Sequence, residues 1–177
     1  MAAKPSPPFN LLLKDFDNTF VTISWSIPLS NGGQYLLGYK VYRKDCTISD
    51  NNPILLQTLS ASEYQFTDST VVGGTEYAYH VTAFNERGGE SESSLTISVT
   101  PITIPSKMDP PTRVTHNLES ITMAWVEPTS DGNSDILEYK LWMRPTYQSA
   151  FEVVYSGSAK EEKVENLKAG FAYQFKI

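Results

Sequence analysis

Hydrophobic and polar residues alternate along several short stretches of this chain. In the clearest stretch, residues 20–27, every second residue is apolar and branched or aromatic. Because successive side chains of a β-strand point to opposite faces, this period of two predicts a strand with one face in a core. The residues predicted to face that core are Val21, Ile23, Trp25 and Ile27.

Other stretches of the same kind follow, separated by turn-forming residues such as Asn31-Gly32-Gly33. Leu37, Tyr39 and Val41 form one alternating set, and Leu95, Ile97 and Val99 form another. The stretches predicted as strands are 9–13, 20–27, 37–42, 54–59, 64–67, 77–83 and 95–99, with turns at 15–18 and 85–90. About seven short strands without helical periodicity indicate an antiparallel β-sandwich.

The pattern occurs twice. Trp25 and Trp125 are 100 positions apart, as are Tyr39 and Tyr139, and the later strands of the second copy follow at an offset of 96. The second copy has predicted strands at 113–116, 121–125, 138–142, 151–155, 163–165 and 173–177. We therefore predict two tandem units, residues 1–101 and 112–177, joined by a proline-rich, semi-rigid linker at 102–111.

The second unit ends at the point where the first still has residues 82–100 to run. It is expected to lack the rest of its sixth strand and all of its seventh. The edge left open would lie beside Tyr173, Phe175 and Ile177. Two explanations stay open: residues beyond 177 of a longer chain supply the strand, or a neighbouring molecule donates it head to tail. Residues 1–13 are the donor candidate.

These features resemble the fibronectin type III family. The resemblance rests on a tryptophan in the second strand, a tyrosine in the third, and a glycine-led turn before the sixth, in both copies. The residues are Trp25, Trp125, Tyr39, Tyr139, Gly74 to Tyr77 and Gly170 to Tyr173, with Ala83-Phe-Asn85 and Gly88-Gly-Glu-Ser91 in the first copy alone. The resemblance implies an all-β fold of two immunoglobulin-like sandwiches, the second lacking its last strand in this chain.

Two details are expected of the glycine-led turn. Tyr77 and Tyr173 are placed like a tyrosine corner, in which the hydroxyl bonds to the backbone a few residues upstream. Gly74 and Gly170 fit a turn that needs a positive φ.

The residue types needed for catalysis do not converge in the sequence. His80 and His116 are each interpreted as surface strand residues, and no metal-ligand spacing is present. The acidic pairs Glu161-Glu162 and Glu90/Glu92 are interpreted as solvated loop charges, and Cys46 as a free thiol in a loop. We therefore predict no enzyme, and no catalytic, cofactor or metal site.

Charge and hydropathy exclude other classes of partner. The net charge is −6 with no basic block, which disfavours nucleic acid and anionic membranes as partners. The first residues lack the apolar core of a signal peptide, and no apolar run approaches ~18 residues, so no membrane insertion is expected of this chain. A place in an extracellular filament and a place in a cytoplasmic scaffold both fit these features.

Two functions are compatible with the pattern. The first is a non-catalytic structural or spacer module of a multi-domain, filament-forming protein, acting through protein–protein contacts or self-association. The alternative is a recognition module that binds a protein or carbohydrate through its loops or sheet edge. Tyr42 and Trp142, which alternate outward at equivalent positions, favour the alternative unless they pack on a neighbouring strand. A third possibility is an appendage to a catalytic domain outside this chain.

Overall fold

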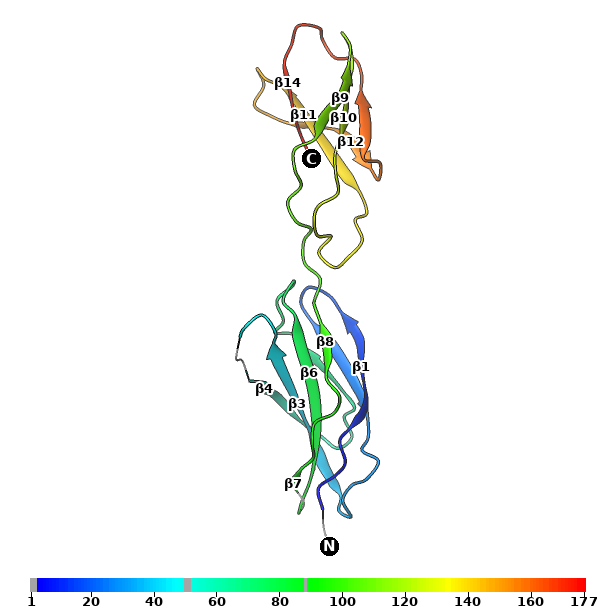
Figure 1. Cartoon of the computed structure of the whole chain (residues 1–177), viewed down its shortest axis with the longest axis vertical. Coiled ribbons are helices and arrows are strands. Elements are labelled where there is room, and N and C mark those ends of the chain that lie inside the picture. The colour runs from blue at the N-terminus through cyan, green and yellow to red at the C-terminus, as the bar shows by residue number, and fades with distance from the viewer. Residues whose placement is uncertain (1–2, 50–51, 88) are drawn as a thin grey trace. The chain divides into compact units, whose positions relative to one another are not determined.

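The chain forms two compact β units, Met1–Thr103 and Ile104–Ile177. The computed structural model describes residues 3–49, 52–87 and 89–177. Gly88, in the predicted 85–90 loop, lies outside this part. All regular elements in the described part are strands, which confirms the all-β prediction (Figure 1).

The first unit is a sandwich of two sheets. One has the strand order β1-β2-β5, and the other has the order β4-β3-β6-β7 with β8 also paired to β6. The strands are β1 (Phe9–Phe16), β2 (Val21–Ser26), β3 (Leu36–Asp45), β4 (Ile54–Ser60), β5 (Gln65–Asp68), β6 (Tyr77–Asn85), β7 (Gly89–Glu90) and β8 (Ile97–Val99).

The inward-facing side chains of the central strands build the core between these sheets. Val21, Ile23 and Trp25 of β2 are buried, as the alternation predicted. Trp25 meets the ring of Tyr39 edge to face at 5.5 Å between centroids. Aromatic pairs of this geometry add stability beyond the area that they bury.

The alternation fails at three predicted positions. Ile27 is 53% exposed because β2 ends at Ser26, and Leu95 is 88% exposed because it precedes β8. Leu37 is 51% exposed because the pairing of β3 with β6 shifts register between Leu36 and Gly38. Such an irregularity turns the following side chains to the other face of a sheet.

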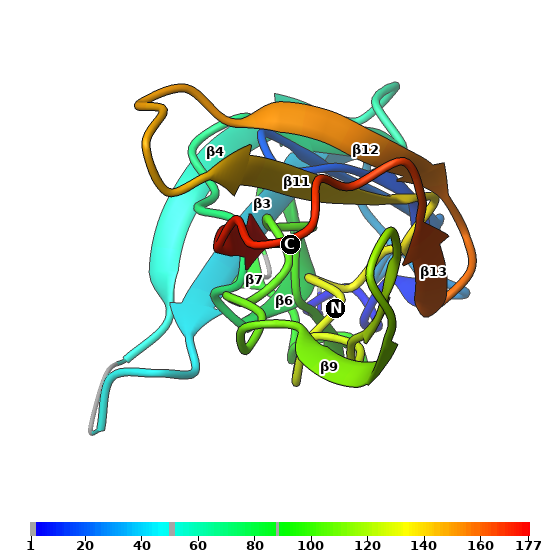
Figure 2. The same cartoon turned by 90° about the horizontal axis from the view of Figure 1, so that it is seen from above.

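The second unit repeats this architecture with fewer strands. Its sheets have the orders β13-β10-β9 and β12-β11-β14. Figure 2, seen from above, shows β11 and β12 on one side of this unit and β9 on the other. The strands are β9 (Thr112–His116), β10 (Ile121–Ala124), β11 (Tyr139–Pro145), β12 (Glu152–Gly157), β13 (Glu161–Val164) and β14 (Tyr173–Lys176).

The division between the units falls inside the predicted linker 102–111. Ile104 begins the second unit, and Ser106 is already tied to it. The Ser106 amide donates to the Ser130 carbonyl, and the Ser130 amide donates to the Ser106 hydroxyl. Ser6 and Ser30 make the same pair of bonds in the first unit, so the entry of each unit is fixed in the same way.

The tyrosine corner is present in both units. The Tyr77 hydroxyl accepts a hydrogen bond from the Val72 amide at 3.1 Å, and the Tyr173 hydroxyl accepts one from the Lys168 amide at 2.9 Å. Gly74 and Gly170, in the turns between, have φ angles of 80° and 82°. A residue with a Cβ is strained there, so glycine is the suitable residue.

A buried ion pair closes one side of the first core. Asp68 accepts hydrogen bonds from Arg43 Nη1 at 2.6 Å, from the Tyr79 hydroxyl at 2.8 Å, and from the amide and hydroxyl of Thr70. Burial alone would raise the pKa of Asp68, but the bonds from Thr70, Tyr79 and Arg43 outweigh it and lower that pKa. The charged carboxylate is therefore the form that the fold selects.

We predict that Trp25→Ala lowers the free energy of unfolding of the first unit by about 3–5 kcal/mol, because the substitution leaves a cavity between the sheets. Urea unfolding followed by circular dichroism measures this loss. Tyr35→Ala, at a ring that is almost fully exposed, is the control and should leave the midpoint unchanged. An equal midpoint for both variants would show that Trp25 is not a core residue.

We predict that Asp68→Asn lowers stability at neutral pH by about 1.5–3 kcal/mol, the usual loss when hydrogen bonds to a charged group are weakened. The folded pKa of Asp68 lies below its ordinary value of 3.8, so its charge contributes stability above that pH and the contribution is lost as pH falls through the folded pKa. Urea midpoints of the variant should therefore fall less steeply below pH 4 than those of the parent. Asp15→Asn, at an exposed carboxylate, is the control. Its urea midpoints should fall below pH 4 as steeply as those of the parent.

Candidate functional site

The second unit has an open side at β14. This strand pairs with β11 through Tyr173 to Lys176, and its other edge has no partner strand among the described residues. The matching strand of the first unit, β6, is paired on both sides, with β3 on one and with β7 and β8 on the other. The open side is therefore the place where the two units differ most.

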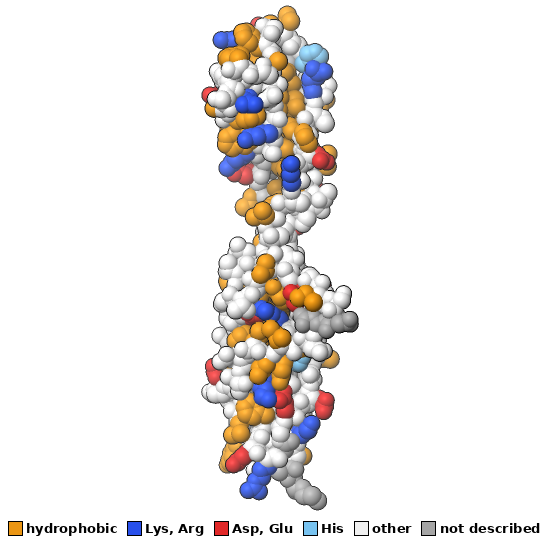
Figure 3. Space-filling view, turned by 90° about the vertical axis from the view of Figure 1, so that its left-hand side faces the viewer, with side chains coloured by type: hydrophobic (Ala, Val, Ile, Leu, Met, Phe, Trp, Pro, Cys, Tyr) orange, Lys and Arg blue, Asp and Glu red, His pale blue; other side chains and the backbone are white. Residues whose placement is uncertain are grey.

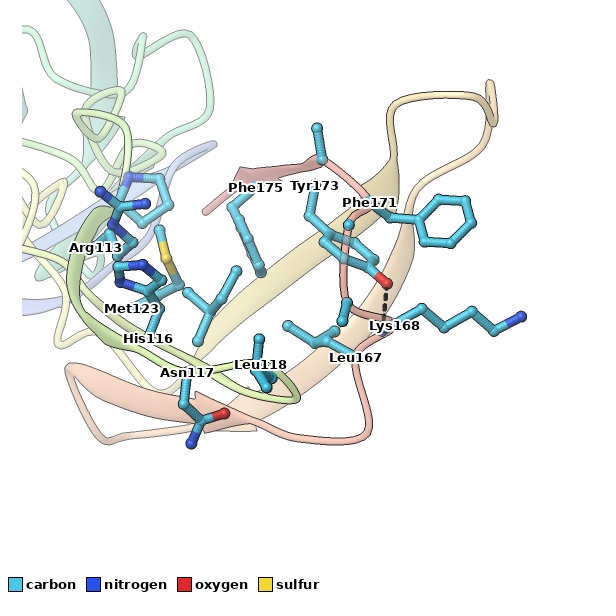
Figure 4. Close-up of a pocket in the computed structure, with 15 residues that line it drawn as sticks. Arg113, His116, Asn117, Leu118, Met123, Leu167, Lys168, Phe171, Tyr173 and Phe175 are labelled. Atoms are coloured by element: carbon cyan, nitrogen blue, oxygen red, sulfur yellow. Dashed lines mark hydrogen bonds between the residues drawn. The ribbon is translucent and has the colours of Figure 1, made fainter.

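A groove of about 700 Å³ lies along this open side, between β9 and β14 (Figure 4). In the close-up, Arg113 and His116 come from β9, Phe175 and Tyr173 from β14, and Met123 lies between them. The lining residues are mostly apolar: Pro111, Arg113, His116, Asn117, Leu118, Ile121, Met123, Leu167, Lys168, Ala169, Gly170, Phe171, Ala172, Tyr173 and Phe175.

The first unit shows what fills the equivalent space. There Val99 of β8 lies opposite Tyr77 and Ile97 lies opposite Tyr79, and these two tyrosines are only 4% and 0% exposed. In the second unit the equivalent rings of Tyr173 and Phe175 are half-buried. A strand laid against β14 in the register of β8 would cover both rings.

Local hydrogen bonds and ring contacts fix the positions of the residues that line the groove. The corner bond from Lys168 fixes the Tyr173 ring, and the Leu167 amide donates to the Glu119 carbonyl of the β9–β10 turn at 2.9 Å. Phe171, at one end of the groove, meets Tyr147 edge to face at 5.4 Å. The groove is thus preorganised by bonds on both sides rather than by a single loop.

The chemistry that this site offers is backbone pairing together with apolar contact. The free edge of a strand presents amide and carbonyl groups, and an extended segment can satisfy them by adding a strand. His116 is exposed at the groove, and no hydrogen bond joins it to a nucleophile or a carboxylate in the described part of the chain. The arrangement suits an extended polypeptide and offers no set of groups for general acid–base chemistry.

Glu90 is not the solvated loop charge that the sequence analysis expected. It lies on β7, within the segment predicted as a loop, and its carboxylate accepts hydrogen bonds from Lys40, Tyr42 and Thr82 at 2.5, 2.8 and 2.6 Å. Burial tends to raise the pKa of Glu90, but these three bonds lower it overall. Glu161 and Glu162 were also predicted in a loop, and they lie on strand β13.

The outward aromatic residues pack on neighbouring strands. Tyr42 stacks on His80 with 4.9 Å between ring centroids, and burial lowers the pKa of His80, with Glu90 opposing that shift. Trp142 lies beneath the ammonium group of Lys176, which is 5.1 Å from the ring centroid. Both aromatic rings are half-buried, which agrees with packing on a neighbouring strand, so neither ring favours the recognition hypothesis.

Other kinds of site find no support in the described residues. No group of three or more His, Cys, Asp or Glu side chains within residues 3–49, 52–87 and 89–177 could hold a metal ion. The thiol of Cys46 is exposed and free. No helix in the same residues has the length and hydropathy needed to cross a bilayer.

Comparison with known proteins gives one family and several longer relatives. The model of the family described as "Fibronectin type III domain" matches residues 6–100. Rat (Rattus norvegicus) neogenin is 27% identical over 180 residues, covering 98% of this chain and 12% of neogenin. Human myomesin-2 is 29% identical over 181 residues, covering 98% of this chain and 12% of myomesin-2. The chain thus spans about an eighth of these relatives.

The fold is also found in a solved structure. The structure of titin kinase and its flanking domains covers 71% of this chain and 28% of its own, with a TM-score of 0.51 and 19% sequence identity. At that identity the likeness concerns the fold alone.

We predict that backbone amides of Tyr173–Lys176 exchange with solvent faster than those of Tyr77–His80, because one edge of β14 is unpaired and β6 is paired on both sides. Hydrogen exchange read by mass spectrometry on peptides that contain each segment measures the difference. Trp142 and Met143 of β11, which are paired with β12 on one side and with β14 on the other, are the control within the second unit and should exchange slowly. Equal protection of β14 and β11 would contradict an open edge.

Proposed function

Because this chain belongs to the fibronectin type III family, we propose that it is a non-catalytic structural module pair of a multi-domain protein and acts through protein–protein contacts. The contact site in this proposal is the free edge of β14 with its groove, and it accepts an extended strand from outside residues 1–177, either of the same longer chain or of another protein. The observation that carries the proposal is the unpaired edge beside the half-buried rings of Tyr173 and Phe175.

Two features of the molecule support strand addition at this edge. Main-chain hydrogen bonds supply affinity in such complexes, and pockets for alternate side chains supply specificity. β14 offers the first, and the groove lined by the rings of Tyr173 and Phe175 offers the second. The pairing of β8 with β6 in the first unit supplies the register: apolar residues face inward opposite the first and third residues of the accepting strand.

The absence of enzymatic activity is part of the proposal. Side chains in the groove are mostly apolar, and its ionisable members, Arg113, His116 and Lys168, come without a carboxylate partner among the described lining residues. A hydrolytic or transfer site needs a nucleophile or a base held by a further group. The long relatives that contain sequences of this kind also favour a modular role over a catalytic one.

The entry segment of this chain is a poor donor for the edge. Residues 1–13 were the donor candidate, but Phe9–Phe16 form β1 and pair with β2 of their own unit. The segment before β1 is also held, since the amides of Ala3 and Ser6 donate to the carbonyls of Gly32 and Ser30. Met1 lies outside the described residues. For this reason the proposal places the donated strand outside residues 1–177.

A synthetic peptide with the sequence of Ser94–Thr100 tests the proposal. It carries the residues that cover the equivalent groove of the first unit, so we expect it to bind the chain and to slow amide exchange in Tyr173–Lys176. The control peptide has Ser98→Pro, which removes an amide and should abolish the protection. Failure of the parent peptide to slow exchange at millimolar concentration would overturn strand addition.

A further inference from the structure

Strand β4 forms one edge of the larger sheet of the first unit. It pairs with β3 from Ile54 to Ser60, and its other edge has no partner strand among the described residues, although strands before and after it in the chain complete both sheets. Figure 3 looks at the side on which β4 lies in Figure 1, and hydrophobic side chains run along the first unit there with a few charged ones between them. Ile54 and Leu55 of β4 are 50% and 49% exposed.

The sequence of β4 distinguishes it from the other edge strands. Natural edge strands are usually protected from pairing by charged residues, prolines, bulges or short length. The seven residues of β4, Ile-Leu-Leu-Gln-Thr-Leu-Ser, include no charged residue and no proline. Strand β8 also lacks a charge, but it has only three residues. The other edge strands of the described sheets all carry charges: Lys14 and Asp15 in β1, Asp68 in β5, Glu90 in β7, Arg113 in β9, Glu152 in β12, Glu161, Glu162 and Lys163 in β13, and Lys176 in β14.

The equivalent strand of the second unit has the protection that β4 lacks. β12 pairs with β11 as β4 pairs with β3, with a register shift at the same place in both pairs. At its first residue β12 carries Glu152, opposite Met143. β4 carries Ile54 at that position, opposite Arg43, so an apolar side chain stands where the second unit has a carboxylate. The register shift leaves Gln57–Ser60 as the regular part of β4, and this part is suited to pair with a further strand.

The absence of charge favours pairing with an identical strand. When a two-fold axis relates two antiparallel strands, each strand meets its own sequence, so a charged residue would lie opposite or next to a like charge. The regular part of β4 brings only Gln, Thr, Leu and Ser side chains into such a pair. Thr58, within it, is exposed, and threonine pairs across two strands are among the stabilising ones.

We propose that the free edge of β4 pairs antiparallel with the same edge of a second copy of this chain, about a two-fold axis close to Thr58. The pair joins the larger sheets of two first units into one continuous sheet. This contact is separate from the β14 edge and does not depend on the proposed function. Because an edge of seven residues gives a smaller contact than the about 1,200 Å² of a stable interface, we expect a dissociation constant on the order of 0.1–1 mM.

Sedimentation equilibrium and amide exchange test this dimer. Between about 10 µM and 1 mM chain, the mean mass should rise toward twice that of the monomer, and exchange in Ile54–Ser60 should slow. An unchanged mass, or a rise in mass without slower exchange in Ile54–Ser60, would overturn the proposal. Slower exchange in Tyr173–Lys176, alone or together with Ile54–Ser60, would show that the copies meet through β14 and that the two-fold pairing is wrong.

Charges placed at Thr58 test the symmetry of the contact. Thr58→Glu and Thr58→Lys should each weaken the dimer about fivefold, because like charges then lie opposite or diagonal to each other. An equal mixture of the two variants should restore dimerisation, since the charges that meet are then opposite in sign.

Ser98→Glu is the matched control, because it adds the same charge at an exposed position of β8, on the opposite edge of the same sheet. It should dimerise as the parent does. Equal weakening by Ser98→Glu and Thr58→Glu would trace the effect to net charge and overturn the proposal. Failure of the mixed Thr58 variants to recover the dimer would overturn it as well.

Discussion

Both units depend on how the backbone amide and carbonyl groups along their edge strands find hydrogen-bond partners. A sandwich of this size has few strands, so each edge exposes a row of amide and carbonyl groups beside the apolar space between its sheets. The first unit meets this constraint by laying β7 and β8 against β6, and the rings of Tyr77 and Tyr79 are buried as a result. In the second unit β14 has no second partner strand among the described residues, and the rings of Tyr173 and Phe175 are half-buried.

The two units otherwise have the same stabilising contacts at equivalent positions. A tryptophan from the second strand meets a tyrosine from the third in each core, at 5.5 Å in the first unit and 6.2 Å in the second. Each entry is tied by a pair of serine bonds, and each glycine-led turn is closed by a tyrosine hydroxyl. These shared contacts fix the sandwich in both units, whereas Tyr42 and Trp142, which differ, lie on the outer face.

The sequence predicted those parts of the fold that local pattern determines. Alternation located the central strands and the buried faces of β2 and β6, and the glycine–tyrosine spacing predicted both corners. It failed at Leu37, where a register shift turns the side chain outward, since a shift depends on the partner strand.

The chemistry of the outer faces could not be predicted in this way. Glu90 was read as a loop charge because Lys40 and Thr82, which donate to it, lie on two other strands. The same holds for the contacts of Arg144 and Lys176 with the Phe151 ring, which form only once β11 and β14 are paired. The open edge itself was predicted from the sequence repeat, but the groove beside it depends on side chains from strands far apart along the chain.

The pairing of the first unit's terminal strands also determines how that unit bears tension. β1 is bonded lengthwise to β2, and β8 is bonded lengthwise to β6, while chain entry and exit lie at opposite ends of the unit (Figure 1). A pull applied at Phe9 and Val99 therefore runs parallel to these strands and loads their hydrogen bonds in shear, so that several must break together. Peeling an edge strand would break them one at a time. Force along the chain would therefore load the hydrogen bonds of β1 and β8 together rather than one by one.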